Sequence, residues 1–500
     1  MFFSSTPSMF EKSAGFPQAV RATQTEAAAR GQVPAPRARL FLISSTHLPC
    51  RCATVRLVAS RALGLVSVKV LVIGSGAREH ALVRALSADP EVDAVIAAPG
   101  NPGIGLTALC VPVEGGPTNP EGVLALAREH AADLVVVGPE APLVAGVADM
   151  LRDNGFACYG PSAEAARLEG SKAFAKDVMS AADVPTGLAH VCSTMEQVED
   201  ALDALGAPHV VKEDGLAAGK GVVVTEDRAA ALDHARACLA KAGGRVVIEE
   251  FLDGPEVSLF CLCDGTTAVA LVPAQDFKRV GDDDEGPNTG GMGAYSPLPW
   301  APDSLAEDVV TRIAQPVLDE MQRRGTPFVG TLFVGLALTS RGPRVIEFNA
   351  RFGDPETQVV LARLRTPLAQ LLLTAATGRL AEVEPLRWAD SAAVTVVVAA
   401  ENYPATPRTG DPILGTDHVA GDDDGSPDTA YVLHAGTAHD GDGVLVSAGG
   451  RVLSVVGTGD TLAEARDRAY AAVGRIDLAG SHHRTDIARR AVDGEITVPG

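Results

Sequence analysis

Three side chains suited to phosphate chemistry alternate within residues 344–357. In an extended strand Glu347, Asn349 and Arg351 share one face, because successive side chains point to opposite sides. A carboxylate and an amide supply the hard oxygen donors that Mg2+ or Mn2+ accepts, and a guanidinium stabilises charge on a transferring phosphoryl group. The spacing therefore predicts Glu347 and Asn349 as metal ligands and Arg351 as a catalytic residue. A solvent-facing strand without chemistry is the competing interpretation.

A glycine-rich loop between two apolar strands offers a place for a polyphosphate. Residues 210–224 read as strand, loop and strand, and no helix follows the loop as it would in a P-loop. Lys220 brings a charge to the loop as a second catalytic candidate, and Lys212 projects from the first strand. A flexible hairpin with solvated lysines is the alternative. The glycines that let the backbone close over phosphates are Gly215, Gly219 and Gly221.

A second glycine-rich turn, formed by Gly74, Ser75 and Gly76, follows a strand and opens a helix. Backbone N–H groups at such a place are free to bind an anion, and the helix dipole favours negative charge there. A dinucleotide fingerprint needs a small residue where Glu79 stands and an acid where the next strand ends in alanine and proline. The turn therefore favours a phosphate-bearing small substrate. A structural turn and a dinucleotide site stay open as alternatives.

The elements that position these groups divide the chain into three folded parts. From Val68, strands at 68–74, 92–97 and 133–137 alternate with helices at 80–88 and 121–130, which predicts a parallel sheet covered on both faces. We therefore expect an α/β protein with a Rossmann-like N-terminal domain over residues 68–168. A central domain over 169–388 and a small α+β C-terminal domain over 390–497 follow. In the last of these, Gly449 and Gly450 stand between two β-branched runs and predict a hairpin turn.

The first 67 residues differ from the rest of the chain. They hold two acids, Glu11 and Glu26, against Lys12 and seven arginines, and no periodic apolar pattern persists. We expect no fold there. The preferred interpretation is that translation starts at Val68, so that these residues are upstream sequence that the native protein lacks. A targeting peptide and an accessory arm are the alternatives.

Composition limits the partners. The formal charge of -21 disfavours binding to a nucleic acid, and no run of 18 or more apolar residues predicts a membrane span. Eight scattered cysteines are too sparse for a disulfide framework and favour a reducing cytoplasm.

Seven segments, in one order, resemble the phosphoribosylamine-glycine ligases of the ATP-grasp superfamily. The likeness runs from about Val68 to the end of the chain. It implies ATP-dependent ligation of glycine to 5-phosphoribosylamine through glycyl phosphate, in a central ATP-grasp domain with a mobile lid at about 188–256. The segments are Val70–Ala81, Val137–Leu143, Leu168–Phe174, residues 210–224, Gln275–Arg279, Gly286–Ser296 and Glu347–Gln358.

The resemblance also implies an ATP site. Two lysines would hold the phosphates, backbone groups near Leu252 would meet the adenine, and Glu256 would accept the ribose hydroxyls. On its own, the acidic strand end at 249–256 would be a solvated edge. The ATP-binding residues it implies are Lys172, Lys212, Gly215, Gly219, Gly221, Glu249, Glu250, Leu252 and Glu256.

The substrates implied by the resemblance are glycine and 5-phosphoribosylamine, with a transient handover of the amine from the upstream amidotransferase. Asp354 or Glu356 would bind the glycine ammonium. Another ATP-grasp ligase or carboxylase is the near alternative, and a nucleotide-binding oxidoreductase or regulator is the distant one. The residues expected near the phosphoribosyl group are Gly74, Ser75, Gly76, Asn101, Pro139, Glu140, Lys278, Arg279, Gly290 and Gly291.

Overall fold

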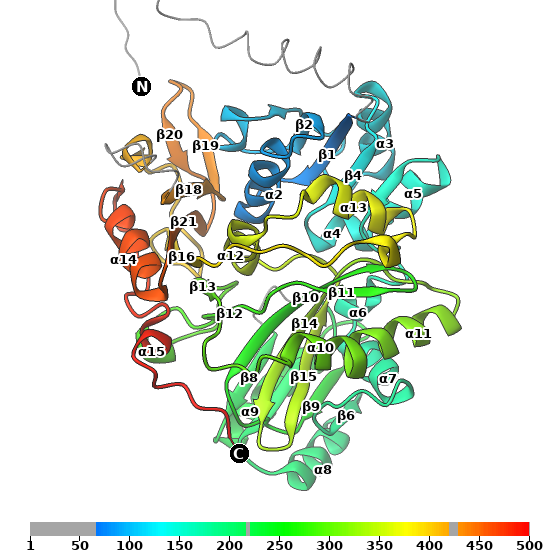
Figure 1. Ribbon diagram of the computed structural model, residues 1–500. Helices are drawn as coiled ribbons and strands as arrows, with labels where there is room; N and C mark the ends of the chain where they lie inside the picture. Colours follow the sequence, from blue (N-terminus) through cyan, green and yellow to red (C-terminus); the bar gives the residue numbers. More distant parts are fainter. Residues whose placement is uncertain (1–66, 217–220, 420–428, 500) are drawn as a thin grey trace, which may run out of the picture. The chain divides into compact units, whose positions relative to one another are not determined.

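The computed structural model describes residues 67–216, 221–419 and 429–499 (Figure 1). Its first sheet consists of five parallel strands. Their order is β3-β2-β1-β4-β5. The predicted strands and helices of this part are confirmed. The strands are β1 (Val68–Gly74), β2 (Val92–Pro99), β3 (Leu109–Cys110), β4 (Leu134–Val137) and β5 (Ala157–Tyr159), and the helices are α2 (Ala77–Ser87), α3 (Pro120–Glu129), α4 (Glu140–Val144) and α5 (Val147–Asp153).

Helix α2 begins three residues before the predicted position. Gly76 takes an extended conformation at the N-cap, and the Glu79 carboxylate accepts its N–H, which forms a capping box. The first helical turn is therefore stabilised by a side chain that the apolar periodicity does not reveal.

A four-stranded antiparallel sheet with its own hydrophobic core occupies the predicted lid region. Its order is β6-β9-β7-β8, and helices α8 (Met195–Leu205) and α9 (Arg228–Leu239) pack against it around Val198, Val211 and Ile248. The strands are β6 (Ala189–Cys192), β7 (His209–Glu213), β8 (Val222–Thr225) and β9 (Val246–Glu249). Gly219 and Lys220 lie outside the described residues.

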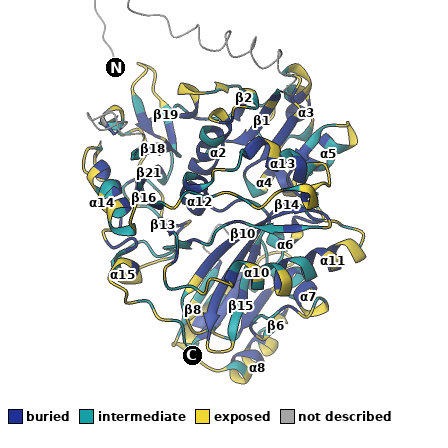
Figure 2. Cartoon of the chain, in the orientation of Figure 1, coloured by how far each residue is buried: buried dark blue, intermediate teal, exposed yellow. Residues whose placement is uncertain are grey.

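A second antiparallel sheet, β11-β10-β14-β15, carries the strand predicted to hold the metal ligands. Its strands are β10 (Glu256–Asp264), β11 (Ala268–Ala270), β14 (Val329–Thr339) and β15 (Gly342–Asn349). Strand β14 is buried along nearly its whole length, as the dark ribbon in Figure 2 shows. Helices from this part of the chain include α6 (Arg167–Gly170), α7 (Lys172–Ala181), α10 (Leu305–Val309), α11 (Gln315–Arg323) and α13 (Leu368–Ala376).

The C-terminal sheet recruits two strands from the middle of the chain. Its order is β12-β13-β16-β21-β18, so β12 (Gln275–Asp276) and β13 (Gly293–Ser296) join β16 (Ala392–Ala399), β18 (Ala430–His434) and β21 (Arg451–Gly459). Helix α14 (Leu462–Val473) contacts β16 and β21, and helix α12 (Glu356–Arg363) contacts β13 and β16 as well as α2. The loop between β12 and β13 therefore lies at the edge of this sheet, while the segment before β12 still pairs with β10 through Ser258 and Ala274.

The hairpin predicted at Gly449 and Gly450 is wrong. Strand β20 (Leu445–Ser447) pairs with β19 (Thr437–His439), whereas β21 pairs with β16 and β18. The two glycines therefore connect different sheets. The Tyr403 ring lies where a Cβ at Gly450 would stand, which explains the glycine at that position. The remaining short elements are β17 (Ile413–Leu414), β22 (Asp477–Leu478) and α15 (Arg489–Val492).

Within the described ranges, no helix is both long enough and apolar enough to cross a bilayer. The described cysteines are all free thiols. The predicted domain boundaries and the cytoplasmic location stay predictions.

Candidate active site

Lys212 lies inside the lid sheet, where its ammonium meets one carboxylate. Its Nζ donates to Oε2 of Glu249 over 3.1 Å and to the carbonyl oxygen of Ile346 over 3.0 Å. Glu249 sits opposite Val210, two residues before Lys212, so both charged side chains emerge on one face of the sheet. The bond to Ile346 joins this face to strand β15, which carries Glu347.

Lys176 is a second cation on the same carboxylate, and the sequence analysis missed it. Its Nζ lies 3.0 Å from Oε2 of Glu249 and donates to the Thr186 hydroxyl over 2.8 Å. Burial lowers the pKa of Lys176, although Glu249 opposes this effect. The signal was available, because Lys176 follows Lys172 by four residues and shares its helix face.

The start of helix α7 holds the beginning of the glycine-rich loop. Ser171 caps the helix and donates to the Asp214 carboxylate over 2.9 Å, while Lys172 donates from Nζ to the Gly215 carbonyl over 3.0 Å. Gly215 has a φ of +138°, which residues with a Cβ rarely adopt. The loop therefore leaves β7 next to the ammonium group of Lys172.

Glu347 is a half-buried carboxylate among cations that are far apart in sequence. Burial alone would raise its pKa, but the charges of Lys278, Lys212, Lys172 and Arg351 lower it below the ordinary value. A Cβ at the facing Gly335 would approach Cγ of Glu347 to 3.3 Å, so this glycine makes room for the acid. The neighbouring positive charges therefore favour the ionised form of Glu347.

The donors on β15 fit a hard divalent cation. Asn349 ends the strand, opposite Phe333, and its amide has no hydrogen bond within the described part of the chain. No group of three or more His, Cys, Asp or Glu side chains in the described ranges is placed to hold a metal. The carboxylate of Glu347 and the amide of Asn349 would therefore need phosphate or water oxygens to complete a shell.

Arg351 lies two residues beyond the end of β15, and two carboxylates bind its guanidinium. Nη2 lies 2.9 Å from Oε1 of Glu169, and Nε lies 3.3 Å from Oε2 of Glu140. Burial would lower the pKa of Arg351, but these two acids raise it. Glu169 also accepts the N–H of Ala350 over 2.8 Å. Sequence reasoning missed Glu169, which joins α6 to the end of β15.

The glycine-rich turn at Gly74, Ser75 and Gly76 has one backbone N–H group fewer to offer an anion than the sequence predicted. The N–H of Gly76 donates to Oε2 of Glu79 over 2.6 Å, and Arg78 donates to Oε1 of the same carboxylate over 2.6 Å. The carboxylate of Glu79 thus takes an N–H group that a phosphate was expected to use. The contribution of Gly74 and Ser75 to a substrate site stays a prediction.

Asn101 was expected to contact substrate, but its amide is committed inside the protein. Nδ2 donates to the carbonyl oxygens of Ser75 and His434, over 2.8 and 2.9 Å, and Oδ1 accepts the N–H of Ile104. Asn101 therefore holds the turn at Ser75 against strand β18.

Lys278 meets the acids of β10 and β12. It donates to the carboxylate of Glu256 and lies 3.6 Å from Oδ1 of Asp276. Glu356, the first residue of α12, accepts the Ser258 hydroxyl over 3.2 Å. Burial, followed by the negative charge of Asp276, raises the pKa of Glu356 to about 7. The predicted ribose ligand Glu256 and the predicted substrate ligand Lys278 therefore pair with each other.

Asp354 precedes this helix and is bound from two sides. Gln358 donates to its Oδ1 over 2.7 Å, and Nη2 of Arg451 lies 3.2 Å from its Oδ2. Burial would raise its pKa, but Arg451 and Arg78 lower it. Asp354 lies beside the glycine turn, since a Cβ at Gly76 would be 3.6 Å from Oδ2.

Two of the predicted ATP residues lie away from the cations. Glu250 accepts the N–H of Leu188 over 3.1 Å and an Arg341 guanidinium hydrogen over 2.5 Å. Leu252 is half-buried beside Gly187. The Glu250 carboxylate thus binds Leu188 and Arg341, and its predicted contact with ATP stays a prediction. Pro139 is the N-cap of α4 and places Glu140 in its first turn.

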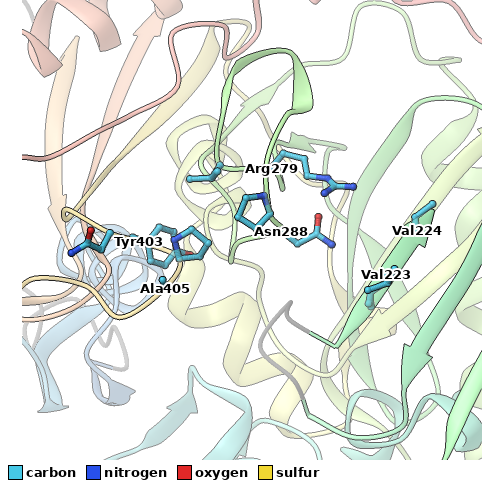
Figure 3. Close-up of a pocket in the computed structure, with 11 residues that line it drawn as sticks. Val223, Val224, Arg279, Asn288, Tyr403 and Ala405 are labelled. Atoms are coloured by element: carbon cyan, nitrogen blue, oxygen red, sulfur yellow. The ribbon is translucent and has the colours of Figure 1, made fainter. Parts of the chain in front are cut away.

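An open cavity of about 720 Å3 lies between the lid strand β8, the loop after β12 and the segment at residues 402–405 (Figure 3). Arg279 and Asn288 line one side, Val223 and Val224 the opposite side, and Tyr403 a third. Arg279 donates from Nη1 to the carbonyl of Gly286 over 2.7 Å, which folds the loop upon itself. That Arg279 meets a substrate stays a prediction.

Family models and relatives match nearly the whole described chain. Three family models of phosphoribosylglycinamide synthetase match the chain. The N domain matches residues 68–169, the ATP-grasp (A) domain matches residues 170–357, and the C domain matches residues 393–490. The phosphoribosylamine--glycine ligase of Streptomyces coelicolor is 66% identical over 423 residues, which cover 85% of this chain and 99% of that protein. The Mycobacterium tuberculosis enzyme of the same name is 57% identical and covers 86% of this chain and 100% of its own.

Solved structures agree. The phosphoribosylamine--glycine ligase from Thermotoga maritima has a TM-score of 0.72 at 31% identity and covers 84% of this chain and 100% of that one. A biotin carboxylase from Campylobacter jejuni, in complex with an ATP analogue, has a TM-score of 0.63 at 13% identity, which shows a shared fold alone. The resemblance found in the sequence is thus confirmed, and the chain belongs to the phosphoribosylamine-glycine ligase family of ATP-grasp ligases.

Proposed function

We propose that the protein ligates glycine to 5-phosphoribosylamine with hydrolysis of ATP, and forms glycinamide ribonucleotide, ADP and phosphate. The observation that carries the proposal is the contact of Nζ of Lys212 with the Ile346 carbonyl oxygen, which brings a lysine of the strand before the glycine-rich loop beside Glu347 on strand β15. The charges of Lys278, Lys172 and Arg351 also lower the pKa of Glu347. Such a cluster of cations neutralises a polyphosphate. The names of the relatives supply the two substrates.

In this proposal Lys172 and Lys212 hold the ATP phosphates, and Lys220 closes over them from the glycine-rich loop. Glu347 and Asn349 hold Mg2+ or Mn2+, and the ion adds Lewis-acid stabilisation of charge on the phosphates. Glu249 already pairs with Lys212 and Lys176, so the lysines reach a phosphate from a fixed position. Backbone groups around Leu252 meet the adenine.

The reaction has two displacements. A glycine carboxylate oxygen attacks the γ-phosphorus of ATP, the bond to the β-γ bridging oxygen breaks, and ADP leaves. The amine of phosphoribosylamine then attacks the carbonyl carbon of glycyl phosphate, phosphate leaves, and the nitrogen loses a proton. Arg351, held by Glu140 and Glu169, stabilises charge on the phosphoryl group. Closure of the lid excludes water from the acyl phosphate.

The proposed amine substrate lies among Gly74, Ser75, Glu140, Lys278 and Arg279. Because Glu79 already binds the N–H of Gly76, the phosphate end of the substrate is better met by the cations of the loop after β12 than by that N–H. Glu356 binds the glycine ammonium. The enzyme acts in the cytoplasm and receives the labile amine from the amidotransferase that makes it.

An ADP-release assay with freshly made phosphoribosylamine tests the proposal. Omission of glycine or phosphoribosylamine should abolish formation of glycinamide ribonucleotide, and bicarbonate should not replace either substrate. Release of ADP that depends on bicarbonate and not on glycine would identify a carboxylase instead.

A further inference from the structure

Arg451 reaches from the C-terminal sheet into the loops predicted to bind substrate. It begins strand β21, where the register pairs it with Ala399. Its guanidinium donates from Nη1 to the carbonyl oxygen of Gly290 and to that of Asp354, the latter over 2.6 Å. Nη2 lies 3.2 Å from Oδ2 of Asp354. One side chain therefore joins two segments that lie more than sixty positions apart in sequence.

The glycines of the loop make this approach possible. A Cβ at Gly290 would lie 3.0 Å from Cζ of Arg451, and a Cβ at Gly291 would lie 2.4 Å from Cδ of Pro355. Gly291 also has a φ of +106°. The turn is thus wedged between the guanidinium and the residue that follows Asp354.

Tyr403 holds the same turn independently. Its hydroxyl accepts the N–H of Gly290 over 2.9 Å, and its ring lies against Gly450, the residue before Arg451. Arg451 therefore binds the carbonyl oxygen of Gly290 while Tyr403 binds its N–H. Gly450 lets the Tyr403 ring pack beside Arg451. This gives a physical reason for the two glycines that were predicted to form a hairpin.

Asp354 extends the connection to the N-terminal sheet, because its Oδ2 lies beside the position of a Cβ on Gly76. The guanidinium thus joins the Gly290–Gly291 turn to an acid at the edge of the first glycine turn. The Gly290–Gly291 turn and the first glycine turn were both expected near the phosphoribosyl group, and Asp354 was expected near the glycine ammonium. The cavity of Figure 3 opens next to Tyr403 and Asn288.

We propose that Arg451 is a positioning residue for phosphoribosylamine, which fixes the Gly290–Gly291 turn against Asp354 so that the C-terminal domain completes the substrate site. The inference rests on the proposed function. It assigns Arg451 no contact with ATP and no step in the chemistry. Loss of the guanidinium leaves the Gly290 and Asp354 carbonyl oxygens without this donor, so the turn loses its fixed position.

Steady-state kinetics on the full chain test this with Arg451→Met, Arg451→Lys and a matched control. Arg408→Met is the control, since Arg408 also binds carboxylates and a carbonyl, but only within residues 401–479. We expect Arg451→Met to lower kcat/KM for phosphoribosylamine roughly tenfold or more, the effect of a lost charged hydrogen bond, while KM for ATP stays within about twofold. Arg451→Lys should restore part of the loss, and Arg408→Met should resemble the wild type.

Tyr403→Phe keeps the inference testable if Arg451→Met does not fold, because it removes a single hydroxyl from the same turn. It should raise KM for phosphoribosylamine with the melting temperature and KM for ATP little changed. The inference is overturned if kcat/KM for phosphoribosylamine is normal in the folded variants. It is also overturned if KM rises equally for ATP and phosphoribosylamine, as a general loss of structure would cause. A wild-type protein that makes no glycinamide ribonucleotide would instead refute the proposed function.

Discussion

Nη2 of Arg351 lies 2.9 Å from Oε1 of Glu169, and both side chains are largely buried. The carboxylate comes from the short helix α6, and the guanidinium comes from the segment after β15. Burial raises the pKa of Glu169 and the charge of Arg351 opposes this, so Arg351 favours the ionised form of Glu169. The pair fixes the cation predicted to meet the transferring phosphoryl group.

Glu169→Gln should therefore lower kcat by about tenfold to a hundredfold, the effect of a weakened charged hydrogen bond, with a small change in KM for ATP. Initial rates of ADP release measure this. Glu164→Gln removes an exposed acid whose one ion pair among the described residues is with Arg167, and it serves as the control. A kcat of Glu169→Gln equal to that of the control would contradict the role of Glu169.

Arg351→Ala should leave the affinity for MgATP largely intact and lower turnover by about a thousandfold or more, as for other arginines that stabilise a phosphoryl group in transfer. Equilibrium titration with ATP and the ADP-release assay give the two quantities. Near-normal formation of glycinamide ribonucleotide by this variant would defeat the assigned role.

Lys212→Ala should weaken ATP binding roughly tenfold or more, because the ammonium that would bind a phosphate is lost. The buried Glu249 keeps Lys176 as a partner, so the fold should survive. Lys241→Ala, which removes a largely exposed lysine paired with Glu213, is the control. Equal ATP affinities for the wild type and Lys212→Ala would rule out contact between Lys212 and a phosphate.

Glu356 should make stability depend on pH. Its pKa is about 7 in the folded protein, above the value of about 4.3 for an unfolded chain, so the folded state binds more protons between these limits. Its contribution to stability is therefore complete below about pH 4.3 and is lost as the pH rises through about 7.

Glu356→Gln removes this titration. The melting temperature of the variant, minus that of the wild type, should therefore increase as the pH rises from 5 to 8. Glu384→Gln, at an exposed acid, controls for loss of charge. A difference in melting temperature that stays constant over this range would show that Glu356 is ionised throughout.

The sequence predicted the α/β class, the first strands and helices after residue 67 and the extended segment that carries Glu347, because period-two alternation and glycine-rich loops are local signals. The phosphate-binding roles of Lys172 and Lys212 were implied by the family resemblance and stay predictions. The structure places Nζ of Lys212 on the carbonyl oxygen of Ile346, beside Glu347. Side-chain contacts between segments that are distant in sequence leave no local pattern from which they could be predicted. The contacts of Glu169 with Arg351 and of Arg451 with Asp354 depend on which sheets become neighbours.

Expectations for the glycine turn and for Asn101 differed from the structure for a related reason. The N–H of Gly76 and the amide of Asn101 look free in a motif, but Glu79 and the backbone of Ser75 and His434 use them in the fold. The strands β12 and β13 show the same effect on a larger scale, since they join a sheet formed mostly by residues after 390.

A crystal structure of the full chain with Mg2+ and a non-hydrolysable ATP analogue tests the central claim most directly. The account predicts the β- and γ-phosphates within hydrogen-bond distance of Lys172 and Lys212, with the ion bound by Glu347 and Asn349. An analogue that lies elsewhere, or whose phosphates point away from strand β15, would contradict it.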